Sequence, residues 1–457
     1  MKRPRLFLSL FIIALSFFLH SGLSLAARPL SLEEALDIAL KDNPQVRAVM
    51  SELKMSEAQK VQARSAFFPR LDVEEGFIRS DNPVMVFMEK LNQELFSQSD
   101  FRIQNLNDPS PRTDWATRLV LTQPIFNRGK EYIGNELSKK AYEITALRQK
   151  AVKQYVAFRV ESAYLKTLLA IQRRKVMTRA VDTARQGYEL ARNRYLAGTA
   201  LKSDMLAAEA RLMRLKHELA TAKAEEKTAM SELNSIMSRP QNEVWELDQG
   251  VLLEKGATRP LESWIELAKE RRPEVAISDK FVELALLKKK GAKLNFLPSL
   301  NLQGDYELHG EDPFSDDGES WSIMAKASFN IFKGLGDKAR LVEASADVER
   351  ARAQRQRVLN ETELEVRSAY HANIAAEEAL RSAKSEVERA KEALRILRRR
   401  YTQGLALMVE VLGAEDALKY AELGLEDARF RQRLSELKLK LFSGTLLTSE
   451  ERVEEAE

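Results

Sequence analysis

The segment Arg194-Tyr195-Leu196-Ala197-Gly198 has a counterpart 206 positions later, Arg400-Tyr401-Thr402-Gln403-Gly404, which shares its arginine, tyrosine and glycine. It belongs to a longer series of matches that covers most of the chain. At the same displacement the matched sets are Trp115 and Trp321, Ile125-Phe126 and Ile331-Phe332, and Ser162-Ala163-Tyr164 and Ser368-Ala369-Tyr370. At a displacement of 229 they are Asn43-Pro44-Gln45-Val46 and Arg272-Pro273-Glu274-Val275, and Phe68-Pro69-Arg70-Leu71 and Leu297-Pro298-Ser299-Leu300. A repeat this long predicts two equivalent structural halves.

The matches divide the 457 residues into five expected parts. These are a signal peptide, a first repeat, a connecting segment, a second repeat and a tail, at residues 1–27, 28–237, 238–260, 261–442 and 443–457. The first part has a basic flank, an apolar run over 6–19 and small residues at 24–27, the pattern of a secretory signal peptide. Export is therefore expected.

Composition narrows the functional classes. Without Lys2, Arg3 and Arg5 the formal net charge falls from +4 to +1, which does not favour nucleic-acid binding. The chain has no cysteine, so disulfides and lipid attachment through cysteine are excluded. Beyond the signal no apolar run reaches about 18 residues, so a membrane crossing would have to use strands.

Each repeat predicts the same series of elements. A leading helix, 31–66 or 261–296, contains an early proline that predicts a break, and Ser31 with Glu34 predicts a capping box. Two strands with period-two alternation follow, which predicts a sheet with one apolar and one polar face. In the second repeat the strand from Trp321 to Phe332 is one of them.

A proline-free helix follows, over 130–197 or 336–403, and about 68 residues at 1.5 Å each span roughly 100 Å. After a turn at Gly198 or Gly404, a return helix covers 203–237 or 407–442. The return and leading helices together match the long helix in length, so two half-length helices stacked end to end are expected beside one full-length coiled-coil helix.

Four strands cannot close a useful pore, because transmembrane barrels begin at about eight strands. If the sheet crosses a membrane, several copies of the chain must share the barrel. Two copies would supply about eight strands and three copies about twelve. The strand pattern alone does not choose between them.

The duplicated order of elements, together with the two Arg-Tyr-x-x-Gly turns followed by Asp204-x-Leu206 and Glu410-Val411-Leu412, resembles the TolC family of outer-membrane efflux proteins. The resemblance covers essentially the whole mature chain. It implies a mainly α fold with transmembrane β structure, in which a homotrimer shares a twelve-stranded barrel in outer-membrane lipid and forms a helical tube through the periplasm. It further implies two partners, a periplasmic adaptor (membrane fusion) protein and an inner-membrane efflux pump or ABC exporter.

The resemblance also suggests site residues. The turns with Arg194, Gly198, Arg400 and Gly404 would form the periplasmic tip and contact the adaptor, although plain helix–helix turns fit the same residues. Candidates for the pore constriction and gate are Glu410, Asp204, Tyr401 and Tyr195. Three copies of Glu410 would form an acidic ring that attracts cations. The relatives' second acid and gate arginine are replaced by Gly413 and Ala406.

Aromatic residues mark the expected strand ends. A membrane-interface girdle is one interpretation and packing at the strand–helix junctions is the other, for Phe68, Phe126, Phe296, Phe332, Trp115 and Trp321. The connection over 80–114 is much longer than its counterpart over 310–320 and carries several aromatic residues. A cap, a plug or a disordered loop all fit it.

No catalytic motif, metal-ligand spacing or cofactor signature is present, so neither an enzyme nor a cofactor is expected. The leading hypothesis is a passive channel-tunnel of a tripartite efflux or type I secretion system. The alternative is an exported coiled-coil scaffold with no pore, in which the apolar sheet face would be a soluble core. Polar substitutions at Leu302, Ile323 or Phe329 would distinguish the two through membrane fractionation.

Overall fold

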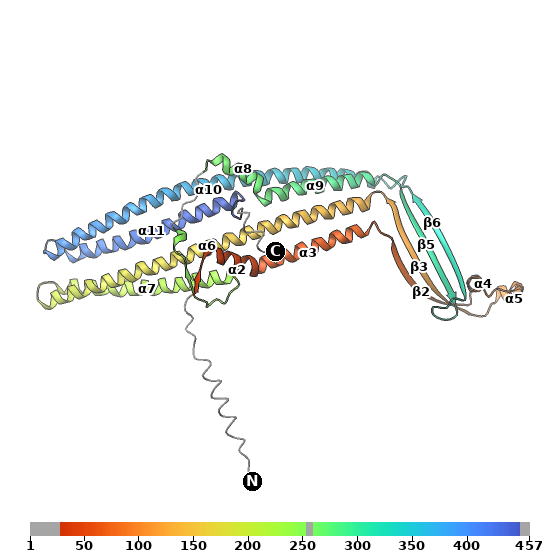
Figure 1. The fold of residues 1–457 in the computed structure, drawn as a ribbon, viewed down its shortest axis with the longest axis horizontal. Coiled ribbons are helices and arrows are strands. Elements are labelled where there is room, and N and C mark those ends of the chain that lie inside the picture. Colours follow the sequence, from red (N-terminus) through yellow and green to blue (C-terminus); the bar gives the residue numbers. More distant parts are fainter. Residues whose placement is uncertain (1–27, 253–258, 448–457) are drawn as a thin grey trace, which may run out of the picture. The chain divides into compact units, whose positions relative to one another are not determined.

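The computed structural model describes residues 28–252 and 259–447 (Figure 1). The predicted signal peptide, residues 1–27, lies outside the described residues, as do 253–258 of the connecting segment and 448–457 of the tail. The chain divides into two compact units, and α6 and α10 contribute to both. Among the described residues, unit 1 comprises 28–47, 152–252, 259–272 and 362–447, and unit 2 comprises 48–151 and 273–361.

The two repeats give the same series of main elements. The first contains α2 (Leu32–Asp42), α3 (Pro44–Ser65), β2 (Arg70–Ser80), β3 (Arg112–Asn127), α6 (Lys130–Leu196) and α7 (Lys202–Ile236). The second contains α8 (Leu261–Arg271), α9 (Pro273–Leu294), β5 (Ser299–Gly310), β6 (Gly318–Ser328), α10 (Gly336–Thr402) and α11 (Met408–Phe442). The predicted tandem repeat in a mainly helical fold is confirmed. No helix of the described ranges is long and apolar enough to cross a membrane.

The leading helix of each repeat breaks where its proline predicts. In the first repeat Asn43 separates α2 from α3, because Pro44 has no backbone N–H to continue the helical hydrogen bonds. The Asn43 amide donates 2.8 Å to the carbonyl of Ile236, near the end of α7, and its Oδ1 accepts from the backbone N–H of Gln45 at 2.9 Å. The break is therefore hydrogen-bonded to the return helix.

Unit 2 contains an antiparallel four-stranded sheet in the order β2-β3-β5-β6. Because side chains alternate between faces, the register sorts them into two sets. One face is apolar and exposed, with Leu71, Val73, Phe77, Leu119, Leu121, Leu302, Tyr306, Trp321 and Ile323. The other face is polar and includes an ion pair of 2.6 Å between Arg118 and Glu307.

The last strand is shorter than expected. β6 ends at Ser328, and Phe329, Ile331 and Phe332 lie beyond it as exposed residues. Ser328 pairs with Ser299, the first residue of β5, so the partner strand has ended at this point. In the first repeat β3 continues to Asn127, because a bulge between Pro124 and Phe126 keeps it paired with β5.

Four helices continue the four strands of unit 2 one to one: α3 leads into β2, β3 into α6, α9 into β5, and β6 into α10 (Figure 1). Contacts between side chains follow the strand order. Lys60 of α3 lies over the ring of Tyr142 on α6, Lys140 of α6 pairs with Glu283 of α9 at 2.9 Å, and Asp279 of α9 pairs with Arg355 of α10. Helices and strands therefore share one lateral order.

Unit 1 contains the largest apolar core, where α2, α6 and α7 meet a short parallel sheet of β1 (Arg28–Leu30) and β4 (Trp245–Leu247). Tyr164 on α6 is fully buried in it. Its hydroxyl donates to the carbonyl of Leu30 and accepts from the N–H of Asp248, each at 2.8 Å. Burial raises the pKa of Tyr164 to about 12. The Tyr164 hydroxyl thus bonds the long helix α6 to β1 and to the residue that follows β4.

We expect Tyr164→Phe to loosen the β1–β4 sheet, because it leaves a buried carbonyl and a part-buried N–H without partners, at a cost of about 1–3 kcal/mol. Hydrogen exchange of the peptide covering 245–250 should accelerate. The matched control is Tyr370→Phe, since Tyr370 is the equivalent in the second repeat and its hydroxyl makes no hydrogen bond within the described chain. Equal exchange in the two variants would contradict the assignment.

Candidate functional site

The two hairpin turns between the long and return helices end their first helix in the same way. Gly198 and Gly404 have φ of +74° and +75°, a conformation that glycine adopts without steric cost. The N–H of Thr199 donates to the carbonyl of Arg194, and the N–H of Leu405 to that of Arg400, at 2.9 and 2.8 Å. These bonds belong to the Schellman motif, which explains the repeated Arg-Tyr-x-x-Gly pattern.

The repeated arginines make different contacts. Arg194 of the first hairpin lies 4.8 Å from the ring centre of Tyr401 in the second, and donates to the carbonyls of Tyr401 and Thr402 at 3.5 and 3.4 Å. Its positive charge thus meets the C-terminal end of α10, where helix carbonyls have no helical partner. Arg400 instead donates to Leu405 within its own turn, at 3.2 Å. The structure therefore brings Arg194 and Tyr401 together.

The other predicted gate residues are less closely joined. Glu410 is exposed and accepts a hydrogen bond of 2.7 Å from the N–H of Leu407, so it caps the start of α11. Asp204 holds the equivalent position on α7, but its side chain has no hydrogen-bond or ion-pair partner in the described chain. Tyr401 is buried, whereas Tyr195 is half-buried.

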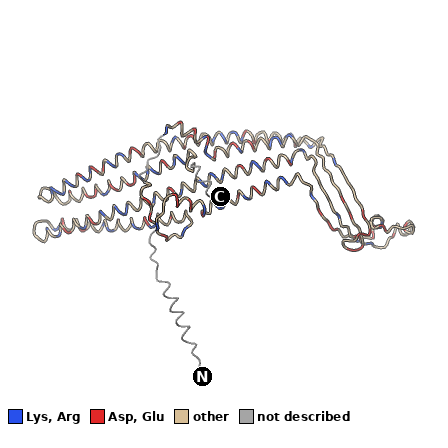
Figure 2. Tube along the Cα trace, viewed as in Figure 1, with Lys and Arg blue, Asp and Glu red and all other residues tan. Residues whose placement is uncertain are grey.

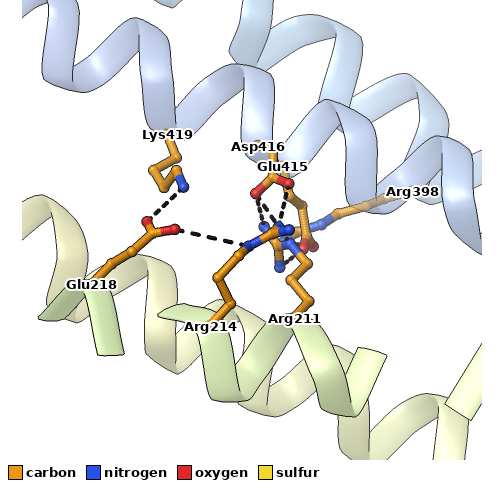
Figure 3. Close-up of polar contacts among 7 residues, drawn as sticks. All are labelled: Arg211, Arg214, Glu218, Arg398, Glu415, Asp416 and Lys419. Carbon is orange, nitrogen blue, oxygen red and sulfur yellow. Dashed lines mark hydrogen bonds and ion pairs between the residues drawn. The ribbon is translucent and has the colours of Figure 1, made fainter. Parts of the chain in front are cut away.

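Behind the turns, an ion-pair network joins α7 of the first repeat to α10 and α11 of the second (Figure 3). Arg211 contacts Glu415 at 2.7 Å and Asp416 at 3.1 Å. Arg398 of α10 reaches the other oxygen of Glu415 at 2.8 Å. The side chains of Arg211 and Glu415 are only 5% and 6% exposed, so these charges are paired away from water.

The network continues along the same two return helices. Arg214 contacts Asp416 at 3.0 Å and Glu218 at 3.8 Å, and Lys419 contacts Glu218 at 2.9 Å with a side chain only 2% exposed. Farther along, Arg173 of α6 pairs with Asp427 of α11 at 2.8 Å. Contacts between the two repeats in this region therefore combine this ionic network with a small buried apolar cluster of Ala191, Ala208, Leu394, Tyr401, Met408 and Val411.

The sequence indicates this network through charged residues at helical-period positions, although no short motif marks them. On α7 the buried positions 208, 211, 212 and 215 follow helical spacing, and Arg211 is the one charged residue among them. On α11 the buried positions 408, 411, 415 and 419 do the same, with Glu415 and Lys419. Charged residues at positions where helical spacing predicts apolar ones indicate buried pairs.

The predicted interface aromatics lie at the two ends of the sheet in unit 2. Near the helices, Phe68, Phe126, Phe296 and Phe332 are all exposed. Near the opposite end, Trp321 is 74% exposed, and the ring of Trp115 lies 4.8 Å from that of Phe77. Within residues 28–252 and 259–447 no group of three or more His, Asp or Glu side chains is placed to hold a metal ion.

The chain matches the family described as "Outer membrane efflux protein" over residues 35–239 and 264–445, which cover nearly all of both repeats. The protein belongs to this family. It is therefore an outer-membrane channel protein of the efflux and secretion type, and the interpretation as a scaffold without a pore is set aside.

Two relatives of this outer membrane efflux protein are similar over nearly their full length. The alkaline protease secretion protein AprF of Pseudomonas aeruginosa is 23% identical over 428 residues, covering 91% of this chain and 85% of AprF. The proteases secretion protein PrtF of Dickeya chrysanthemi is 22% identical over 434 residues, covering 92% and 89%.

Solved structures share the fold of this outer membrane efflux protein. The CmeC outer membrane channel of Campylobacter jejuni superposes with a TM-score of 0.77 at 18% identity, covering 91% of this chain and 85% of CmeC. The outer membrane protein VceC of Vibrio cholerae gives a TM-score of 0.76 at 18% identity, covering 90% and 96%. At this identity the likeness establishes the fold alone.

We expect Arg211→Ala to loosen the second hairpin from the first, because it leaves Glu415 buried with one partner fewer. Removing one partner of a buried ion pair costs about 3 kcal/mol or more. Hydrogen exchange over 411–420 should rise by at least about tenfold. Arg214→Ala is the matched control, since the Arg214 side chain is 56% exposed and should have a small effect. Unchanged exchange in Arg211→Ala would show that the network does not hold the hairpins together.

Proposed function

We propose that the protein is the passive exit duct of a type I secretion system and that it works as a homotrimer. One observation carries this proposal: within the described residues, an amphipathic four-stranded sheet has two unpaired edges, β2 and β6, and each strand adjoins a helix in the chain. In lipid every unpaired backbone group costs several kcal/mol, so such a sheet has to be closed by further strands. Three copies would supply about twelve strands, enough for a water-filled barrel.

The exposed apolar face would then contact outer-membrane lipid, and the polar face with Arg118 and Glu307 would line the lumen. On this proposal Phe68, Phe126, Phe296, Phe332, Trp115 and Trp321 lie at the two membrane interfaces. The four helices that continue the strands would close in the same order, so that the barrel extends into a helical tube. The predicted domain division at residues 237, 260 and 442 is retained as part of this proposal.

The hairpin turns are proposed as the docking surface for the periplasmic adaptor, with the inner-membrane exporter as the next component. Residues 197–201 and 403–407, which connect the long helices to the return helices, contain no charged residue (Figure 2). Leu196, Leu201, Leu405 and Leu407 are each at least 65% exposed. Exposed apolar side chains that are rimmed by charged helices are typical of a protein–protein contact.

The ion-pair network is proposed as the latch that keeps the entrance closed. Its charges separate when the second hairpin moves away from the first, and a water-filled tube can rehydrate them, which lowers the cost of opening. The interhairpin contact of Arg194 with Tyr401 would add to the latch. Glu410, which is exposed, is proposed to form the acidic ring at the constriction, and Asp204 and Tyr195 to contact neighbouring copies.

Single-channel recording of the purified protein in a planar bilayer tests the duct. We expect a small, cation-selective conductance, a loss of selectivity in Glu410→Ala because the acidic ring is removed, and a larger conductance in Arg211→Ala because the latch is loosened. Arg381→Ala is the control and should conduct like the unsubstituted protein, because exposed Arg381 pairs with Glu378 of its own helix and lies outside the network.

The outcomes separate the parts of the proposal. Folded protein that forms no pore would exclude the duct. A pore whose selectivity is the same in Glu410→Ala would keep the duct and reject the ring. A pore whose conductance is the same in Arg211→Ala would reject the latch.

The cargo is proposed to be protein, because AprF and PrtF are named for the secretion of proteases. Deletion of the gene should remove one or more proteins from the culture medium and leave susceptibility to small toxic compounds unchanged. Plasmid-borne wild-type protein should restore secretion. Hypersensitivity to such compounds with an unchanged set of secreted proteins would instead identify a small-molecule efflux duct.

A further inference from the structure

The long connection between β2 and β3 folds back onto the sheet of unit 2. It contains α4 (Pro83–Asn92), a short 3-10 helix (Gln98–Phe101) and α5 (Ile103–Asn107). The side chains of Phe87, Phe96 and Phe101 join these pieces, with ring centres 4.8 and 5.2 Å apart. The segment is therefore folded, and it lies at the end of the sheet away from the helices (Figure 1).

A buried polar cluster attaches the end of α4 to the sheet. Gln93 is fully buried, and its amide donates 2.9 Å to the carbonyl of Thr113 and 2.8 Å to Oδ1 of Asp114. Its Oε1 accepts from Arg112 at 2.8 Å. The other carboxylate oxygen of Asp114 lies 2.9 Å from Nδ1 of His309 on β5. Gln93 thus joins the end of α4 to β3, and Asp114 extends the cluster to β5.

The register shows which face of the sheet α4 covers. Ala116 pairs with His309, and Asp114 lies two residues before Ala116, so Asp114 and His309 share a face with Arg118 and Glu307. This is the polar face.

Gly318 gives an independent indication. It pairs with His309, and a Cβ atom placed there would lie 2.0 Å from the carbonyl oxygen of Asn92 in α4. The backbone of α4 therefore rests on the polar face at a position where only glycine leaves room.

The side of α4 that faces the sheet includes buried Val86 and Glu89. Burial, together with the charge of Asp114, raises the pKa of Glu89. The opposite side presents Val84, Met88 and Leu91, which are 67%, 55% and 49% exposed. The helix is thus attached by its buried side and leaves apolar side chains exposed on the other.

We infer that residues 81–111 form a cap that narrows the outer mouth of the channel, held over the polar face by Gln93, Asp114 and His309. The inference rests on the proposed function, because the polar face is a lumen only if the sheet closes into a barrel. The counterpart connection over 311–317 is too short to do the same, so each copy contributes one cap. A bulky cargo would have to displace the caps, whereas small ions would pass between them.

The absence of cysteine allows a direct test with single thiols. Met324 lies on the polar face of β6, six residues beyond Gly318, and is 47% exposed. In Met324→Cys the thiol would sit below the cap. Asp312→Cys, in the exposed connection between β5 and β6, is the control that shows how fast each reagent modifies an unobstructed thiol. Intact cells carrying the full-length protein are treated from outside with a small cationic methanethiosulfonate and with a polymer-linked maleimide.

We expect the small reagent to modify Met324→Cys in every background. The bulky reagent should react at least about tenfold more slowly with it than with Asp312→Cys. Adding Gln93→Ala, which removes the anchor, or Gly318→Ala, which displaces α4 sterically, should remove most of that difference. Gln98→Ala, an exposed glutamine of the same segment, is the matched control and should change nothing.

Bulky-reagent labelling of Met324→Cys that is as fast as that of Asp312→Cys before any second substitution would overturn the cap and leave the duct intact. Slow labelling that neither Gln93→Ala nor Gly318→Ala accelerates would also overturn it. If neither reagent reaches Met324→Cys in any background while Asp312→Cys reacts, the polar face is not open to the exterior. That result would contradict the proposed function itself.

Discussion

The edges of the sheet in unit 2 impose the constraint on which the rest of the structure depends. β2 and β6 each present a row of backbone groups without partners within the described chain, and the face that crosses all four strands is apolar and exposed. Neither feature is stable in isolation, since open edges invite pairing and exposed apolar faces invite burial. The helices that continue the strands inherit the same open order, from α3 at one side to α10 at the other. The sheet and the helices that adjoin it thus form an open layer, which further strands and helices would have to close.

Different chemistry holds different parts of unit 1 together. Around Tyr164 the contacts are apolar and the buried hydroxyl is fully hydrogen-bonded, which favours a fixed arrangement. Near the hairpin turns the two repeats share only a small apolar cluster, and the buried ion pairs of Arg211 and Glu415 lie beside it. Apolar packing is lost as soon as water enters, whereas separated charges recover hydration in water. Ionic contacts are therefore suited to the proposed role of this region, which is to separate and close again.

Most of the fold could be predicted because each sequence pattern involves neighbouring residues and occurs in both repeats. Pro44 and Pro273 marked the helix breaks, Gly198 and Gly404 the turns, and alternation marked the strands. The end of β6 was misplaced because strand length depends on the partner, and β5 begins only at Ser299. The site was predicted less well. Glu410 and Tyr401 were suggested by resemblance and stay predictions. The helical period marks Arg211 as a buried charge, but its partners, like those of Gln93, lie far along the chain, and no local pattern identifies them.

The two repeats differ in how firmly their long helices are attached to the rest of unit 1. Tyr164 ties the first long helix to two strands, while Tyr370, at the matching place in the second, makes no hydrogen bond through its hydroxyl within the described residues. Within the described residues, only the first copy ties its long helix to two short strands through a buried hydroxyl. The first hairpin is thus braced at a place where the described part of the second shows no such hydrogen bonds. A force that bends both hairpins is expected to bend the second hairpin more than the first. The first repeat would then be the fixed part and the second the moving part, before any partner binds.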